Sequence, residues 1–125
     1  MRLLLDTHIF LWWEGNNPKL SKAIQSKITS AQEVYISSVS IWESAIKIAT
    51  GKLEANIDNL VKAINQEGFI ELPVTIKHAA TVSQLPDLHK DPFDRLLLAQ
   101  AISEPLRFLT ADKMLSQYSD IVEVV

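Results

Sequence analysis

Residues 2–7 read Arg-Leu-Leu-Leu-Asp-Thr, a short apolar run that ends at a carboxylate. The run shows no alternation of polar and apolar residues, which is typical of a strand buried on both faces. Strands of this kind occur in parallel sheets whose faces are covered by helices. We therefore expect the remainder of the chain to supply further buried strands and the helices that connect them.

Strand and helix patterns alternate along the rest of the sequence. Apolar runs predict further strands at 33–37, 69–72, 107–109 and 121–124. Apolar residues at helical spacing predict helices at 9–13, 21–30, 39–50, 57–66, 75–83, 92–103 and 113–117. This alternation predicts a single α/β domain over residues 1–125, built on a parallel sheet that helices cover.

Composition limits the classes to which the protein can belong. The chain has 125 residues, 47% hydrophobic and 22% charged, so a domain with a proper core is expected rather than a disordered chain. The absence of cysteine excludes disulfide scaffolds, thiolate zinc sites and cysteine nucleophiles. The net charge of −3 is unlike that of proteins that coat nucleic acid without specificity. The longest apolar run, Ile9–Trp13, is too short for a membrane span and Asp6 interrupts any signal peptide, so we expect a soluble, cytoplasmic protein.

Acidic side chains follow the predicted strands at the points where sites form in open α/β sheets. Asp6 directly follows the first strand, and Asp112 follows the fourth. Glu43 lies in the first turn of the helix after the second strand, and Asp91 and Asp94 open the helix before the fourth. Helices that follow parallel strands begin at one edge of the sheet, so we expect these carboxylates to converge there.

Each of these carboxylates also has a purely structural interpretation. Ser40 and Glu43 match a capping box, in which the glutamate returns a hydrogen bond to the serine backbone. Asp91 precedes a proline and is well placed as a helix N-cap. Asp6 and Asp112 are each placed to cap the helix that follows them. For any one of these residues alone, a structural role such as helix capping is favoured over a catalytic role.

The set of acids favours a metal site. Asp94 begins a helical face that continues with Leu97 and Leu98, so its carboxylate is expected to be buried, which is costly without a partner. Arg95 lies on the other side of that helix. Lys47 lies one helical turn from Glu43, where we expect an ordinary ion pair on the surface. Clustered carboxylates with few cations need another source of positive charge. Oxygen-only ligands suit Mg²⁺ or Mn²⁺ rather than zinc.

A magnesium ion held by carboxylates is suited to the hydrolysis of phosphodiesters, because it activates water and neutralises phosphate oxygens. Other chemistries have less support: the three glycines are isolated, and the sequence has no phosphate loop, nucleophile elbow or closely spaced histidine pair. We expect His78 on a helix surface and His89 in a loop. His8 either orients Asp6 or packs, and packing is favoured.

Six blocks of sequence, in order along the whole chain, resemble the PIN-domain family, specifically the VapC toxins of prokaryotic toxin–antitoxin pairs. They are Leu4-Leu5-Asp6-Thr7-His8 with Leu11-Trp12, Ser37-Ser38-Val39-Ser40-Ile41-Trp42-Glu43, Lys47 with Gly51-Lys52-Leu53, Leu85-Pro86, residues 89–101 with Asp91-Pro92-Phe93-Asp94-Arg95, and Leu109-Thr110-Ala111-Asp112. Lys90 departs from the pattern, since similar sequences often carry arginine there.

The resemblance implies a three-layer α/β/α sandwich around a mostly parallel, twisted sheet, and the activity of a Mg²⁺-dependent endoribonuclease in which Mn²⁺ can substitute. The family's acidic quartet falls on Asp6, Glu43, Asp94 and Asp112. Asp6 and Asp94 would be the principal metal ligands. Glu43 would ligate the metal or hold a water molecule, and Asp112 would act directly or through water. Asp91 is expected to be an N-cap, with a supporting role behind the ligands as the alternative.

The resemblance also implies partners. They are an RNA substrate, a small cognate antitoxin whose tail enters the acidic groove, and a second copy of the chain in a homodimer. No association with a membrane is expected. Trp12 and Trp13 either contribute to the antitoxin surface or pack in the core, and the two interpretations are equally supported.

Three alternatives remain open at this point. A receiver-like, Mg²⁺-binding regulatory domain would need a phosphoacceptor aspartate after the central strand; the third strand, taken as central, ends in Leu72-Pro73 instead. A PIN-like interaction module without activity is disfavoured because all four acids are present. A nuclease of the same fold that acts on DNA is the nearest alternative.

Overall fold

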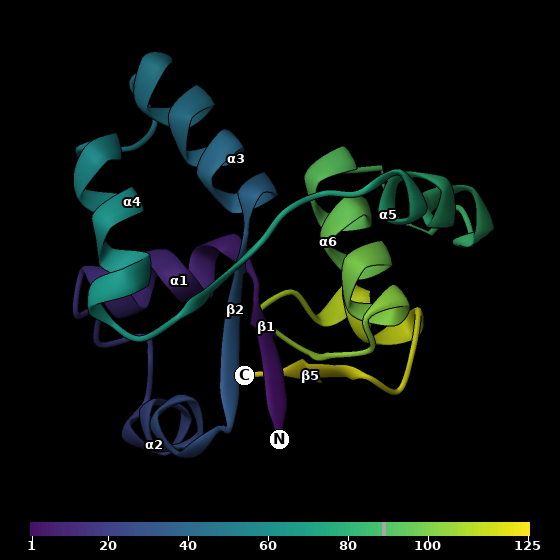
Figure 1. Ribbon diagram of the computed structural model, residues 1–125, viewed down its shortest axis with the longest axis horizontal. Coiled ribbons are helices and arrows are strands. Elements are labelled where there is room, and N and C mark those ends of the chain that lie inside the picture. The colour runs from purple at the N-terminus through teal and green to yellow at the C-terminus, as the bar shows by residue number, and fades with distance from the viewer. Residues whose placement is uncertain (89) are drawn as a thin grey trace.

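The protein is built on a five-stranded parallel sheet in the order β3-β2-β1-β4-β5, as seen in a computed structural model that describes residues 1–88 and 90–125 (Figure 1). The strands are β1 (Arg2–Leu5), β2 (Glu33–Ser37), β3 (Ile70–Leu72), β4 (Arg107–Thr110) and β5 (Val122–Val124). Every neighbouring pair is parallel. The three leucines of β1 are fully buried, as expected for the central strand of a sheet with both faces covered.

Helices cover both faces of the sheet, so the α/β/α sandwich is confirmed. They are α1 (Thr7–Glu14), α2 (Lys22–Ser30), α3 (Ser38–Ala49), α4 (Ile57–Gln66), α5 (Ile76–Thr81) and α6 (Pro92–Ser103), with 3₁₀ turns at Val82–Gln84 and Lys113–Gln117. Figure 1 shows α1, α2 and α4 on one side of the strands and α5 and α6 on the other. Successive residues of a strand point to opposite faces, so Leu3 and Leu5 join one core while Leu4 joins the other.

The third strand is not central, contrary to the sequence-based expectation. β3 pairs only with β2 and lies at an edge of the sheet, whereas β1 is the middle strand. The apolar content of a short run does not reveal its place in the sheet. The residue that follows the central strand is therefore Asp6, and the argument based on Leu72-Pro73 against a receiver-like domain does not hold.

Helix α3 begins three residues earlier than the proposed capping box required. Ser37 is its N-cap, with its hydroxyl oxygen accepting a hydrogen bond from the Val39 N–H at 3.0 Å. Ser40 therefore lies inside the helix, Glu43 lies in its second turn, and the Ser40–Glu43 capping box is wrong. The reason is that Ser37, Ser38 and Ser40 can all cap a helix, and the helix is capped by Ser37, the last residue of β2.

His78 is buried rather than exposed on a helix surface, so that prediction is also wrong. Its Nδ1 accepts a hydrogen bond from the Thr75 N–H at 3.1 Å, and the Thr75 hydroxyl caps the same turn. Its Nε2 lies 2.5 Å from Glu104 Oε2 on the loop after α6. Helix α5 is short and packs against α6, which encloses this side chain. The expected position of His89 lies outside the described residues.

Across the described ranges, 1–88 and 90–125, no helix combines the length and the apolar character that a membrane crossing requires.

Candidate metal centre

The four predicted acids and Asp91 line one cavity of about 310 Å³ at the carboxyl edge of the sheet. Asp6 is carried there by the junction of β1 and α1, and Asp112 by the turn after β4. Glu43 projects from α3 and Asp94 from the first turn of α6. Parallel strands end at a common edge, which brings together side chains that are far apart in the sequence.

Asp6 is almost completely buried, with 4% of its surface exposed. Its Oδ1 accepts a hydrogen bond from the Thr7 N–H at 2.7 Å, and its Oδ2 accepts one from the Thr110 hydroxyl at 2.5 Å. Burial raises the pKa of this carboxyl, and the charge of Glu43 raises it further, while the two hydrogen bonds oppose the change. The Asp6 carboxylate thus lies in a site that favours added positive charge.

Glu43 is a buried carboxylate with only one oxygen satisfied. Its Oε2 forms an ion pair with Lys47 Nζ at 2.8 Å, and its Oε1 is buried without a hydrogen-bond partner among the described residues. The expected ion pair is confirmed, but its surface location is wrong, because the Glu43 side chain is only 6% exposed and that of Lys47 is 30% exposed. A buried carboxylate oxygen without a partner carries an energetic cost unless a cation or water reaches it.

Asp91, Asp94 and Asp112 are half-buried at the wall of the same cavity. Asp91 Oδ1 accepts hydrogen bonds from the N–H groups of Phe93 and Asp94, at 2.8 and 3.2 Å, so its predicted N-cap role is confirmed. Asp112 Oδ1 caps the following 3₁₀ turn by accepting from the Met114 N–H at 2.9 Å. These capping carboxylates line the same cavity as Asp94.

Three hydroxyl residues that organise the site were missed by the sequence analysis. The Thr110 hydroxyl donates to Asp6 and accepts from the Asp112 N–H at 3.0 Å, so it joins two of the acids. The Thr7 hydroxyl donates to Ser40 Oγ at 2.9 Å, which ties the start of α1 to α3. A threonine next to or near an aspartate at both strand ends, in Asp6-Thr7 and Thr110-Ala111-Asp112, was the available signal.

The aromatic and histidine side chains near the site have mixed roles. His8 is exposed and lines the acidic cavity, with its ring edge-on to Trp12 at 6.4 Å between centroids. Trp12 and Trp13 are half-buried and pack against the core, and Trp13 also contacts the ring of Phe69. The packing interpretation of both tryptophans is therefore supported by contacts.

The donor set of the cavity fits a divalent ion held by oxygen ligands. Its lining includes five carboxylates and one lysine, Lys47. As the side chains stand, no three acidic or histidine groups among the described residues are close enough together to hold one ion. The unpartnered Glu43 Oε1 and the buried Asp6 carboxyl are nevertheless the kind of groups that a hard cation stabilises.

Comparisons with known proteins show the family to which the chain belongs. Residues 3–121 match the family model of the PIN domain. The chain is 30% identical over 119 residues to Ribonuclease VapC22 of Mycobacterium tuberculosis, covering 93% of this chain and 91% of that protein. It also superposes on chains in two crystal structures, those of VapBC2 from Rickettsia felis bound to a promoter DNA fragment and of DNA-bound VapBC from Salmonella typhimurium.

These superpositions extend over nearly the whole chain but concern the fold alone. The TM-scores are 0.77 and 0.71, at 17% and 16% sequence identity, and each covers 99% of this chain and 98% of the other. The family model and the relative at 30% identity carry the assignment, and the superpositions agree with it in fold. The chain belongs to the PIN-domain family, in its VapC group.

Proposed function

We propose that this protein is a metal-dependent endoribonuclease and the toxin of a toxin–antitoxin pair, with Asp6, Glu43, Asp94 and Asp112 as its catalytic, metal-binding residues. The observation that carries the proposal is the buried Glu43 Oε1, which has no hydrogen-bond partner among the described residues, in a side chain that lines a cavity together with four other carboxylates. The relative at 30% identity is named a ribonuclease, which supports RNA as the substrate.

In this proposal the four acids have different roles in binding the ion. Asp6 and Asp94 are the principal ligands, Glu43 is a ligand or holds a water molecule, and Asp112 acts directly or through water. When bound, the divalent ion, which we propose to be Mg²⁺ with Mn²⁺ as a substitute, supplies an activated water and neutralises charge on the phosphate oxygens.

The surrounding side chains keep these acids in place before the ion arrives. Thr7 and Thr110 hold the two oxygens of Asp6, which fixes the direction of its remaining lone pairs. Lys47 holds one oxygen of Glu43, and the other oxygen has no hydrogen-bond partner among the described residues. Asp91 caps α6, so the turn that carries Asp94 is fixed as well. These contacts fix the segments that carry the acids, and among the described residues the carboxylates must still move closer together to hold one ion.

The acidic cavity also supports the proposed antitoxin partner. Structural neighbours of this chain were solved as VapBC complexes, two of them with DNA. A cationic antitoxin tail would complement five carboxylates and compete with the metal for them. We further propose that the chain works in the cytoplasm and as a homodimer.

RNA cleavage by the purified protein tests the function. Cellular RNA is incubated with the protein in Mg²⁺ and in chelator, beside DNA of matching sequence. We expect RNA to be cut only with the metal, and Asp6→Asn and Asp94→Asn each to slow cleavage by more than about a hundredfold, because several kcal/mol of charge stabilisation is lost.

The exposed Asp120 provides a matched control, since Asp120→Asn removes a carboxylate that does not line the cavity. Its cleavage rate should equal that of the parent protein. Cleavage that persists in both site variants would contradict the assignment of the acids, and cleavage of DNA in preference to RNA would contradict the substrate.

A further inference from the structure

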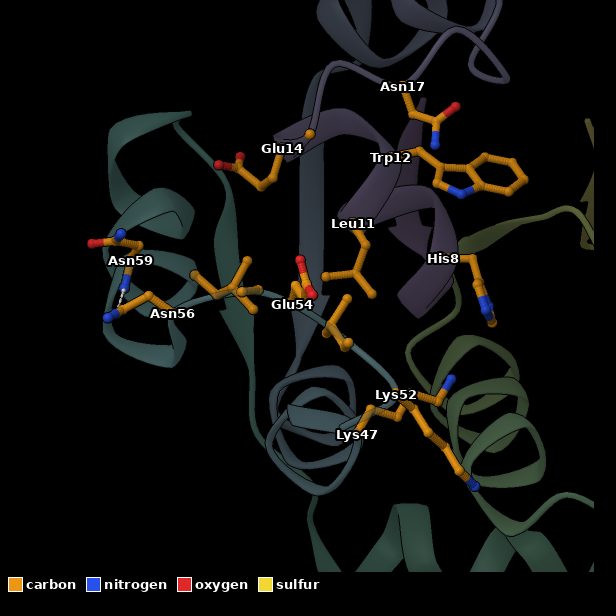
Figure 2. Close-up of a pocket in the computed structure, with 14 residues that line it drawn as sticks. His8, Leu11, Trp12, Glu14, Asn17, Lys47, Lys52, Glu54, Asn56 and Asn59 are labelled. Atoms are coloured by element: carbon orange, nitrogen blue, oxygen red, sulfur yellow. Dashed lines mark hydrogen bonds between the residues drawn. The ribbon is translucent and has the colours of Figure 1, made fainter. Parts of the chain in front are cut away.

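We propose that a second, larger pocket beside the acidic cavity is a binding subsite for a single-stranded segment of RNA next to the phosphate that is cut. This inference rests on the proposed function and adds to it the place where the substrate chain continues. The pocket has a volume of about 700 Å³ and lies between α1, the end of α3 and the start of α4 (Figure 2). Its size is within the range that holds organic ligands, about 300–1,000 Å³.

The larger pocket and the acidic cavity share part of their walls. His8, Trp12 and Lys47 line both of them. An RNA strand that is cut internally must extend from the acidic cavity on both sides of the cut. A neighbouring pocket with a common wall is therefore a direct route for the nucleotides that follow.

Lys52 supplies the larger pocket with a cation for a sugar–phosphate chain, next to Lys47, whose ammonium group pairs with Glu43. Lys52 follows Gly51, whose φ of +76° allows a tight turn at the end of α3. The Lys52 N–H donates to the Lys47 carbonyl at 2.8 Å, so the two lysines lie together at this turn. Figure 2 shows both side chains toward the side where His8 stands. The lysines are thus next to the acidic cavity, where the phosphate chain would leave it.

Stacking and amide groups in the same pocket suit nucleobases. Trp12 presents a half-buried indole to both cavities, and aromatic rings are stacking platforms for unpaired bases of any sequence. The opposite part of the wall carries Asn56 and Asn59, which Figure 2 shows away from the lysines. Asparagine amides pair with the hydrogen-bonding edges of bases, and Asn56 would do so through its amide nitrogen, because its Oδ1 caps α4.

The acids in the larger pocket determine how the strand would run. Glu14 and Glu54 also line it, and Glu14 Oε2 is buried without a hydrogen-bond partner among the described residues. Phosphates are repelled by these groups and attracted by the lysines, so the backbone is expected on the lysine side. The bases, which carry donor groups, are expected toward the glutamates and asparagines.

RNA binding that is measured separately from cleavage tests this subsite. The probe is a fluorescein-labelled, mixed-sequence, single-stranded RNA of about 12 nucleotides, and its anisotropy is followed with protein in the Asp94→Asn background, which removes cleavage. Within that background, Lys52→Gln, Trp12→Leu and Trp12→Phe are compared. Lys77→Gln, on the exposed surface of α5, is the matched control.

We expect Trp12→Leu to raise the Kd by roughly tenfold and Trp12→Phe to restore most of the affinity, because phenylalanine stacks and leucine does not. Lys52→Gln should raise the Kd by about threefold or more and reduce the slope of log Kd against log salt by about one, while Lys77→Gln changes neither. In the cleaving protein, the Lys52 substitution should raise KM and leave kcat within about twofold.

Parent-like binding by both Lys52→Gln and Trp12→Leu would overturn the subsite. The same holds if these substitutions weaken only binding of an antitoxin peptide, because the pocket then accepts a protein segment. If Trp12→Leu does not fold, Lys52→Gln decides alone, since its side chain is exposed. Absence of cleavage by the parent protein contradicts the proposed nuclease function, whereas an unchanged Kd in the variants contradicts the subsite only.

Discussion

Thr110 joins two acids of the site through a single hydroxyl group. It donates to Asp6 Oδ2 and accepts from the Asp112 N–H. Loss of a group that orients a metal ligand in this way typically lowers metal affinity by about 10–100-fold. The side chain is fully buried, so it cannot be replaced by water without a change in the site.

We therefore predict that Thr110→Val lowers the affinity for Mn²⁺ by about 10–100-fold, because valine keeps the volume and loses the donor. Thr110→Ser should recover most of the affinity, since it restores the hydroxyl. Isothermal titration calorimetry with Mn²⁺ measures both variants. Equal affinities for the valine variant and the parent would show that Thr110 has a packing role only.

Asp6 is expected to make the metal-free protein less stable as pH rises. Its pKa is raised by burial, so the folded protein holds this proton at pH values where the unfolded chain has released it. The unfolded state then binds fewer protons, and the free energy of unfolding falls as pH rises from the unfolded pKa to the raised folded pKa. Below the unfolded pKa both states are protonated, so this contribution to the pH dependence is absent.

Asp6→Asn should remove that contribution, and in chelator at neutral pH it should be more stable than the parent although it is inactive. Urea unfolding in EDTA across about pH 4–8 measures the difference, with Asp120→Asn as the charge-matched control. A parent whose stability rises with pH relative to Asp6→Asn would contradict the burial of a carboxylate in an unfavourable site.

At the scale of elements, helix starts were only partly predictable. The N-cap at Asp91 was correctly predicted, because a proline follows it and fixes the first turn. The start of α3 was not, since Ser37, Ser38 and Ser40 all have the chemistry of a cap and only the end of β2 distinguishes them. The structural alternative for Glu43, a hydrogen bond to the backbone of its own helix, therefore fails, and Glu43 lines the acidic cavity as expected for a member of the acidic set.

The burial of His78 could not be predicted from the sequence either. Helix α5 is short and mostly exposed, and the partners of the imidazole lie elsewhere, with Glu104 after α6 and Gln100 within it. Both ring nitrogens are used, one to cap α5 and one to join it to the end of α6. Contacts between distant segments of this kind leave no local periodic pattern.

His78→Ala should lower the free energy of unfolding by about 2–3 kcal/mol, because it removes a cap and leaves buried polar groups unsatisfied. His78→Gln should lose less, since glutamine at this helix position can return the capping hydrogen bond. Urea unfolding gives the stability, and Mn²⁺ titration should give parent-like affinity for both. Equal losses for alanine and glutamine would contradict the capping role.

At the scale of the whole molecule, the parallel α/β/α architecture followed from apolar runs that alternate with helices, but the order of the strands did not. β3 was taken as central and lies at an edge, because pairing depends on which apolar faces meet in three dimensions. The convergence of Asp6, Glu43, Asp94 and Asp112 on one cavity did follow from the common edge of parallel strands. The hydroxyl groups that hold them did not, because serine and threonine occur throughout the chain.

A divalent ion that neutralises the acidic cavity should stabilise the entire domain. At a Mg²⁺ or Mn²⁺ concentration about 100 times the Kd, mass action adds roughly 2.7 kcal/mol to the free energy of unfolding, which corresponds to several degrees in Tm. We expect this rise for the parent and for Asp120→Asn, and no rise for Asp94→Asn. Thermal scans with and without metal measure it, and an equal rise in all three proteins would place the ion elsewhere.

The most direct measurement is an anomalous difference map from a crystal of this protein soaked in Mn²⁺. The acidic cavity is predicted to hold a peak within coordination distance, about 2.0–2.6 Å, of oxygen atoms from Asp6 and Asp94, with Glu43 as a further ligand or one water molecule away. A map with no peak in that cavity, or with manganese bound only at other carboxylates of the surface, would contradict the metal centre and the nuclease mechanism built on it.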